Sequence, residues 1–372
     1  MSTILQIATQ EPSSDVGEGD DVQEVFIDPP LHIHESKIID MDVVDAFANG
    51  PSTITQEEMD GVLARLAIDV EEMRKACRVE QRTPQWHAYR KYRVGSSRSY
   101  AATGKSYKTP YSHFVGDLLY GSMQDGPVGF ACLQGTRNEP LCEAGALQTY
   151  QRDENARCKA LHIPAIRHIE VVHEGTLIWP RHPMFNASID GVAFVQYEDD
   201  KWDVFGCEWK CPLMKGGYKG SVPIEYYYQV QQQLTIYEDS GHLYYLMAQR
   251  DIDPSQDMVV GWKWRSMFAV WQRGVILQRQ FIPWDKPKFM THVEEVKALY
   301  MKHVVPRIIR MERGEIQFPC IDWAPPLVLD DPVDVLSDED DGQRSITDAT
   351  EVAHACLGIL QKWEDTHTAQ EE

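Results

Sequence analysis

Two short stretches in the middle of the chain carry side chains that suit metal-assisted chemistry. Asp190 is followed by a glycine, and Glu208 and Lys210 lie two residues apart within an apolar run. If the two stretches form neighbouring strands of a hairpin, Asp190 and Glu208 converge, while Glu208 and Lys210 leave the same face of their strand. Two carboxylates and the backbone carbonyl of Trp209 are hard oxygen ligands that suit Mg²⁺. The pattern predicts a site where a metal ion polarises a phosphate group and Lys210 orients a water and offsets negative charge.

The Glu-x-Lys spacing is common, so its surroundings decide what it means. The same spacing occurs at 35–37 and at 295–297, where a solvated charged surface is the simpler interpretation. At 208–210 the neighbours include Val204 and Trp209, so the charges there would be partly buried. Burial of a charge is costly unless the charge is paired or bound to a metal ion. The instance at 208–210 is therefore the candidate.

Other polar residues flank this pair along the chain. Glu139 follows Gly135 in what we expect to be the first turn of a helix, where its charge would also complement the helix dipole. Gln229 and Gln231 lie on a predicted helix just after the strand pair, and a solvated helix face explains them equally well. From the residues alone, both interpretations of these three side chains stay open.

The elements that must position these residues follow from the spacing of apolar residues. Thr55 and Glu58 have the spacing of a capping box and predict the start of a helix. β-branched and aromatic residues predict strands within 166–172, 185–197 and 202–211. The other expected elements are helices over 135–150, 226–237 and 286–312, the last kinked at Pro306, and a strand over 243–248. This order predicts an α/β fold in which helices flank a mixed central β-sheet.

Charge divides the chain into a core and two acidic ends. The net charge is −21, but residues 1–80 hold 5 basic and 18 acidic side chains, and residues 321–372 hold 2 and 14. The region between them holds 29 basic and 25 acidic side chains, which is compatible with binding to a nucleic acid. We expect four parts: a disordered acidic tail over 1–53, a helical lead-in over 54–80, a catalytic domain over 81–318, and an acidic linker with a short C-terminal helix over 319–372.

The cysteines and the hydrophobic pattern indicate the cellular environment. Eight cysteines are scattered without a CxxC pair, which predicts reduced, mostly buried thiols and no zinc or iron–sulfur set. No run of eighteen apolar residues occurs, and Met1–Gln10 lacks the basic start and apolar stretch of a secretory signal. We therefore expect no membrane association and an intracellular location, in the cytoplasm or nucleus, or in a host cell if the chain is virus-encoded.

Taken in order, these motifs resemble those of the YqaJ-like viral recombinases and lambda exonuclease, within the PD-(D/E)xK nuclease superfamily. The resemblance covers roughly residues 81–300, and Ile189 replaces the proline that is usual before the first aspartate. The motifs that carry it are Gln85-Trp86-His87, Arg93-Val94-Gly95-Ser96-Ser97, Gly135-x-x-x-Glu139-Pro140, Ser188-Ile189-Asp190-Gly191, Glu208-Trp209-Lys210-Cys211-Pro212 and Gln229-Val230-Gln231.

The resemblance implies a role for each matching residue. It implies a restriction-endonuclease-like core whose site binds Mg²⁺ or Mn²⁺, with one or two ions. The implied assignments are Asp190 and Glu208 as the metal-binding acidic pair, Lys210 as the catalytic lysine, Glu139 as the glutamate that completes the metal site, Gln229 and Gln231 as the glutamine motif beside it, and Arg93 with Ser97 or Ser99 as the contact to the DNA 5′ end and its phosphate.

The implied activity is a metal-dependent exonuclease that degrades linear double-stranded DNA in the 5′→3′ direction, in recombination, repair or viral DNA processing. The implied partners are DNA ends, a single-strand annealing protein and two further copies of the chain in a ring-shaped trimer. Two alternatives stay open: a structure-specific or single-strand endonuclease on the same fold, and a catalytically silent DNA-binding or scaffold protein. The intact set of Asp190, Glu208 and Lys210 argues against the silent protein.

Overall fold

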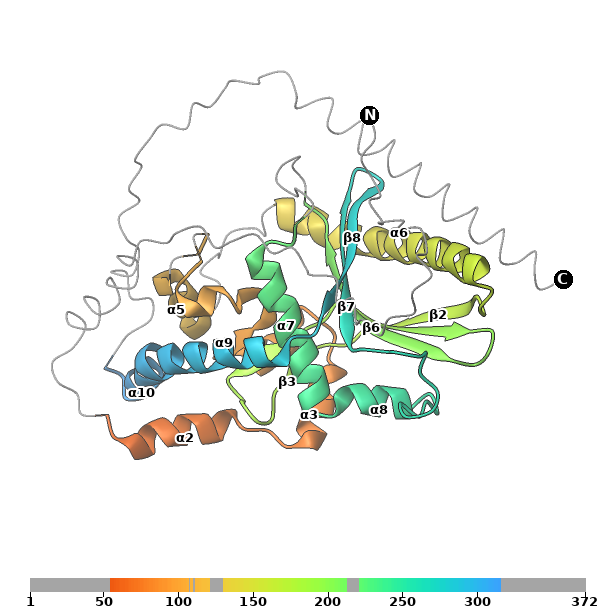
Figure 1. Ribbon diagram of the computed structural model, residues 1–372. Coiled ribbons are helices and arrows are strands. Elements are labelled where there is room, and N and C mark those ends of the chain that lie inside the picture. The colour runs from red at the N-terminus through yellow and green to blue at the C-terminus, as the bar shows by residue number, and fades with distance from the viewer. Residues whose placement is uncertain (1–53, 107, 110, 121–129, 213–220, 316–372) are drawn as a thin grey trace, which may run out of the picture.

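The structure is a computed structural model that describes residues 54–315 except 107, 110, 121–129 and 213–220 (Figure 1). The acidic tail predicted over 1–53 and the linker and C-terminal helix predicted over 319–372 therefore lie outside the described residues. None of the helices in the described part is long and apolar enough to cross a membrane.

A five-stranded mixed sheet forms the centre of the described chain (Figure 1). The strand order is β2-β5-β6-β7-β8, in which β6 and β7 are parallel and the other three neighbouring pairs are antiparallel. The strands are β2 (Ile166–Val172), β5 (Gly191–Tyr197), β6 (Trp202–Lys210), β7 (Arg265–Gln272) and β8 (Val275–Pro283). The predicted α/β class with a mixed central sheet is confirmed, as is the hairpin that links the two candidate stretches.

A second, three-stranded sheet of short strands packs beside the first. It has the order β1-β4-β3, with β1 parallel and β3 antiparallel to β4. The strands are β1 (Val94–Gly95), β3 (Leu177–Ile178) and β4 (Phe185–Ala187). The segment predicted as one strand over 185–197 is therefore two strands, β4 and β5, and the break between them contains Asp190.

Helices cover both faces of the central sheet (Figure 1). Successive side chains of a strand point to opposite faces, so Val204 packs into a core with α7, while Phe205 packs into a second core with α6. The helices are α2 (Gln56–Leu66), α3 (Val70–Cys77), α4 (Pro84–Arg90), α5 (Tyr111–Tyr120), α6 (Phe130–Leu161), α7 (Ile224–Asp239), α8 (His242–Ala248), α9 (Lys286–Leu299) and α10 (Val305–Glu312), with 3-10 turns at Ser96–Arg98 and Ala101–Thr103 and a π-helical segment at Tyr300–Val304.

Several helix predictions are confirmed at the level of individual residues. The Thr55 side chain accepts from the Glu58 backbone N–H, and the Glu58 carboxylate accepts from the Thr55 N–H at 2.9 Å, so the capping box at the start of α2 is present. The helix predicted over 226–237 is α7. The long closing helix is interrupted where Pro306 predicted a kink, because the π-helical segment ends just before α10.

Two predicted elements are wrong in extent or type. The helix expected to begin after Gly135 is the 32-residue α6, so Glu139 lies inside it and not in its first turn. Packing of Cys142, Ala146 and Tyr150 against the sheet outweighs the low helix propensity of Gly135 and of an internal proline. The strand expected over 243–248 is helix α8, in which Leu243, Leu246 and Met247 are buried at helical spacing. Short apolar runs do not distinguish a strand from a buried helix.

Candidate active site

The β5–β6 hairpin brings the two predicted carboxylates to the same end of the central sheet. Gly191 pairs with Cys207 across the hairpin, so Asp190, just before β5, lies beside Glu208 on β6. Asp190 Oδ2 accepts a hydrogen bond from the Trp209 backbone N–H at 2.6 Å. This bond ties the loop that carries Asp190 to the strand that carries the other two candidates.

Glu208 is the most enclosed of these side chains, since it is 1% exposed. Its Oε1 accepts from the Lys210 ammonium and from Gln229 Nε2, the latter at 2.7 Å, and its Oε2 accepts from Gln233 Nε2 at 2.7 Å. Lys210 leaves β6 on the same face, as the two-residue spacing predicted. One cation and two amides thus satisfy a carboxylate that would be costly to bury alone.

The charges at this site do not balance. Burial, followed by the nearby charge of Glu208, raises the pKa of Asp190 well above its ordinary value, against the opposing effects of Lys210 and the Trp209 N–H. Burial alone would lower the pKa of Lys210, but Glu208 and Asp190 outweigh it and raise that pKa. Two carboxylates therefore face one ammonium. The surplus negative charge and the hard oxygen donors fit a divalent cation such as Mg²⁺.

Helix α6 lines the open side of Asp190. Asp190, Trp209, Glu139 and Glu143 line a cavity of about 700 Å³, and Glu208 is not among its lining residues. Glu139 forms an ion pair with Arg82 at 3.3 Å, one helical turn before Glu143. The cavity thus gives access to Asp190 and Trp209, whereas Glu208 does not reach its surface.

Glu143 and His173 are site residues that sequence reasoning missed. Glu143 accepts from Trp209 Nε1 at 3.1 Å and pairs with His173 Nε2 at 3.3 Å, and His173 Nδ1 lies 2.8 Å from the Asp190 carbonyl oxygen. The hydrogen bond to Glu143 raises the pKa of His173 to about 9, despite partial burial. The signal for Glu143 was available, because residues four apart share one helix face and Glu139 was already a candidate.

The glutamine motif divides between two faces of α7. Gln229 and Gln233 both reach Glu208, whereas the structure does not bring Gln231 to the carboxylates. The Gln231 amide instead donates to the Pro283 carbonyl and accepts from the Asp285 N–H, at 2.7 and 2.8 Å. Residues two apart lie on different sides of a helix, and residues four apart on the same side. Gln233, which the sequence reasoning missed, could have been found from this spacing.

The residues expected at the DNA 5′ end do not form one cluster. The Arg93 guanidinium is buried and donates to the backbone carbonyls of Pro183, Tyr89 and Leu66. Ser97 is exposed, whereas Ser99 is fully buried with its hydroxyl 2.9 Å from His292 Nε2.

Arg90 points toward the loop that carries Asp190, between β4 and β5. Its Nη1 donates to the Ser188 hydroxyl at 3.1 Å, and its guanidinium stacks over the Trp86 ring at 4.2 Å. A Cβ on Gly95 would lie 2.7 Å from Arg90 Nη2, so this glycine makes room for the guanidinium. Burial, followed by the charge of Arg98, lowers the pKa of Arg90 to about 10, and no carboxylate in the described part of the chain pairs with it.

Comparisons with known proteins give one family. The model of the YqaJ-like viral recombinase domain matches residues 85–241, a span that contains Glu139, Asp190, Glu208, Lys210 and the glutamine motif. No curated protein gives a significant match. Among solved structures, an alkaline exonuclease from Laribacter hongkongensis is 17% identical with a TM-score of 0.38, and the match covers 63% of this chain and 100% of that one. The same exonuclease in complex with dAMP gives the same identity and coverage and a TM-score of 0.39. Residues 85–241 of this chain are therefore similar to the YqaJ-like viral recombinase domain.

Proposed function

We propose that this chain is a metal-dependent exonuclease that hydrolyses linear double-stranded DNA from its ends in the 5′→3′ direction. The observation that carries the proposal is the pair of carboxylates, Asp190 and Glu208, beside Lys210, with Asp190 open to a cavity of about 700 Å³ that α6 lines. We propose residues 81–318 as the nuclease domain and recombination, repair or viral DNA processing as its context.

The proposed chemistry assigns a task to each side chain. Asp190, Glu208 and the Trp209 carbonyl hold a divalent ion, Mg²⁺ or Mn²⁺, and Glu139 supports a second ion. Such an ion supplies Lewis acidity toward the scissile phosphate. Lys210 orients the attacking water and offsets the negative charge that develops on the phosphate as the bond to the leaving oxygen breaks. Gln229 and Gln233 hold the Glu208 carboxylate in place for this task.

The first experiment is incubation of the purified protein with 5′-phosphorylated linear duplex DNA and Mg²⁺, alongside covalently closed circles and an EDTA control. The proposal expects loss of the linear DNA alone, in the presence of the metal. Label at one 5′ or one 3′ end then gives the direction. Cleavage of circles would replace the proposal by an endonuclease on the same fold. DNA binding without cleavage, in Mg²⁺ and in Mn²⁺, would replace it by a silent binding protein.

Gln233 should matter for catalysis, and Gln231 should not. Gln233→Ala is expected to lower kcat/KM on linear duplex DNA by about 10- to 100-fold, the usual loss when an outer partner of a metal ligand is removed. Gln231→Ala is the matched control on the same helix, and it should lower the melting temperature yet leave kcat/KM within about threefold. Equal losses of activity in both variants would contradict the assignment of Gln233.

Arg90, in place of Arg93, is the proposed contact to the DNA 5′ phosphate, because the Arg93 guanidinium already donates to three carbonyls. Arg90→Met is expected to reduce the preference for a 5′-phosphate over a 5′-hydroxyl by about 10-fold or more, since a charged hydrogen bond contributes about 1.5–3 kcal/mol. The measurement is the ratio of initial rates on the two duplexes. Arg98→Met is the control, because Arg98 pairs with Asp117 at 3.1 Å. An unchanged ratio in Arg90→Met would remove this contact.

The proposed function brings expected partners and an expected location. They are double-stranded DNA ends, a single-strand annealing protein and two further copies of the chain in a ring, inside a cell and without a membrane. The mass of the protein in solution, measured by light scattering with and without DNA, tests the trimer.

A further inference from the structure

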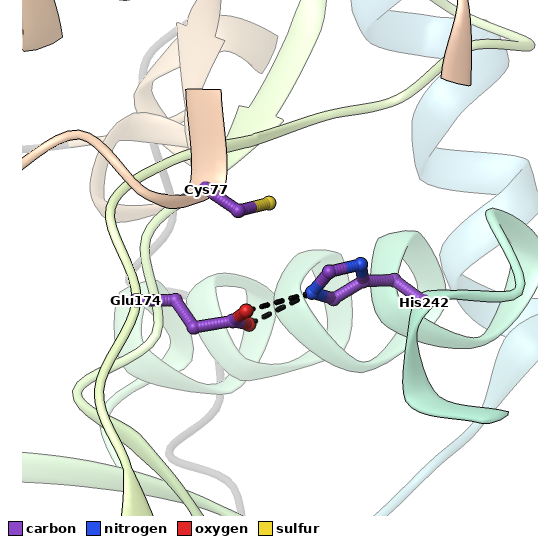
Figure 2. A group of neighbouring side chains, drawn as sticks. All are labelled: Cys77, Glu174 and His242. Atoms are coloured by element: carbon purple, nitrogen blue, oxygen red, sulfur yellow. Dashed lines mark hydrogen bonds and ion pairs between the residues drawn. The ribbon is translucent and has the colours of Figure 1, made fainter. Parts of the chain in front are cut away.

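A second group of potential metal ligands lies on the wall of the same cavity. Cys77 ends α3, Glu174 lies between β2 and β3, and His242 begins α8 (Figure 2). One ligand atom from each lies within 4.8 Å of the other two, and no other such group of three occurs among the residues that the structure describes. All three residues line the cavity that also contains Asp190. None of these three residues belongs to the set proposed for DNA hydrolysis.

Backbone contacts hold the Glu174 segment against the end of α3. The Gly175 N–H donates to the Cys77 carbonyl at 2.6 Å, and the Thr176 N–H donates to the Ala76 carbonyl at 3.3 Å. A Cβ on Gly175 would lie only 2.1 Å from the Val79 carbonyl oxygen, so only glycine permits this approach. The distance between Glu174 and Cys77 is therefore fixed by the main chain and not by flexible side chains.

A second set of contacts orients the Glu174 carboxylate. His242 Nε2 lies 2.8 and 3.0 Å from its two oxygens (Figure 2). The buried Tyr237 hydroxyl donates to Oε2 at 3.0 Å. Outer partners of this kind usually orient the carboxylate ligands of metal sites. The Glu174 carboxylate thus faces the His242 imidazole, and Tyr237 on α7 fixes its orientation.

Within the described residues, two of the three ligand groups have no side-chain hydrogen bond to a residue outside the group. Cys77 is 4% exposed, and its thiol forms no hydrogen bond within the described chain. His242 is 2% exposed, and its contacts to Glu174 are its only side-chain hydrogen bonds among the described residues, since Nδ1 is buried without a partner. Burial, with the charge of Glu174 second, raises the pKa of the Cys77 thiol, so without a metal it stays neutral.

We propose that Cys77 Sγ, Glu174 and His242 Nε2 bind a Zn²⁺ ion. Sulfur, nitrogen and oxygen together suit a borderline-soft ion with tetrahedral coordination, whereas Mg²⁺ takes oxygen ligands. A thiolate and a carboxylate neutralise the two positive charges, and the thiol proton is released to solvent on binding. Two ligands about 2.0–2.1 Å from a tetrahedral zinc lie about 3.3 Å apart, so Nε2 and Oε1, now at 2.8 Å, need to part by about 0.5 Å.

The cavity can supply a water as the fourth ligand, because all three residues line it. An ion here would join α3, α8 and the segment between β2 and β3, which together form one wall of the cavity around Asp190. Its role is to fix this wall, and its binding does not depend on whether the nuclease proposal holds.

The test uses the full chain, stripped with chelator and reloaded with Zn²⁺ or Co²⁺. Wild type is expected to retain one zinc per chain after dialysis, and its cobalt form to show the near-ultraviolet absorption of a cobalt–thiolate bond. Cys77→Ser should abolish that absorption, and Glu174→Gln should weaken zinc binding by at least about 100-fold, beyond the loss typical of an outer partner.

Two controls separate this site from other metal binding. Cys158→Ser changes another buried cysteine beside a glutamate, with Sγ 3.8 Å from Glu154 Oε1, but with no histidine in such a group. Asp190→Asn removes a proposed catalytic ligand. Both should keep the cobalt–thiolate absorption. Absence of that absorption in wild type, or its persistence in Cys77→Ser, would overturn the proposal, and the wild-type result stands even if a variant fails to fold.

Discussion

Replacing Asp190 with asparagine is expected to lower DNA hydrolysis by at least about a thousandfold while making the metal-free protein more stable. The loss follows because a bound metal ion contributes several kcal/mol to the transition state, and each 1.36 kcal/mol changes a rate tenfold. The gain in stability follows from the raised pKa of Asp190, since its charged form is disfavoured in the fold by burial and by Glu208. The amide keeps an oxygen that can accept from the Trp209 N–H, so the loop stays tied to β6.

The stability effect of Asp190 has a definite pH dependence. A carboxyl group whose pKa is raised by folding destabilises the fold at every pH above its unfolded pKa, and acidification removes that cost as the folded group takes up its proton. The melting temperature of Asp190→Asn in EDTA should therefore exceed that of wild type at neutral pH, and the difference should shrink as the pH falls. Added Mg²⁺ should stabilise wild type more than the variant.

Asp203→Asn provides the matched control, because Asp203 lies at the other end of β6 but is already paired. Its carboxylate accepts from Arg265 at 2.7 Å and from the Tyr150 hydroxyl at 3.1 Å. Removing one partner of a buried ion pair is destabilising by about 3–5 kcal/mol, so this variant should melt earlier than wild type at neutral pH. If Asp190→Asn also melted earlier in EDTA, the excess of negative charge at the site would be refuted.

Replacing Lys210 with methionine should slow hydrolysis by about two to three orders of magnitude, the usual cost of losing one preorganised charge that faces the transition state. Methionine keeps an unbranched apolar stem but leaves Asp190 and Glu208 without their ammonium. In EDTA the variant should therefore unfold at a lower temperature, and Mg²⁺ should restore part of the loss by supplying positive charge. The measurements are single-turnover rates and melting curves with and without Mg²⁺.

Lys297→Met tests whether any lysine in a Glu-x-Lys pattern would give the same result. Lys297 lies on α9, its side chain is 42% exposed, and its ammonium is 3.9 Å from the more exposed Glu294 carboxylate. Exposed ion pairs contribute little to stability, so this variant should match wild type in rate and in melting temperature. A Lys210→Met enzyme that kept a tenth or more of the wild-type rate would remove Lys210 from the proposed chemistry.

The strand-borne part of the site was predictable because its geometry is local. A period of two residues determines that Glu208 and Lys210 share a face, and a hairpin brings Asp190 beside them. The helix-borne part was only partly predictable. The sequence of the glutamine motif alone does not show which face of α7 packs against the sheet. In the structure this face carries Gln229 and Gln233, which both donate to Glu208.

Contacts between distant segments were beyond sequence reasoning. The sequence does not distinguish Arg90 from Arg93, because their roles depend on residues far away in the chain. The Arg93 guanidinium donates to three backbone carbonyls, whereas the Arg90 guanidinium donates to Ser188, two residues before Asp190. The group of Cys77, Glu174 and His242 escaped for the same reason, because no local spacing marks it. Glu174 is held beside Cys77 by the close backbone approach at Gly175, which helix and strand propensities do not predict.

Because side chains alternate between the two faces of β6, the proposed activity depends on the register in which β6 pairs with its neighbouring strands. Glu208 faces α7 and its glutamines, whereas Trp209 packs on the side of α6. A slip of this strand by one residue would exchange the two faces. The acid would then meet the aliphatic and aromatic packing beneath α6, and an indole would face the amides. Such a misfolded form could retain most of its secondary structure, yet it would lack the proposed catalytic centre. Nuclease activity, as proposed here, would therefore distinguish correctly folded molecules from near-native competitors.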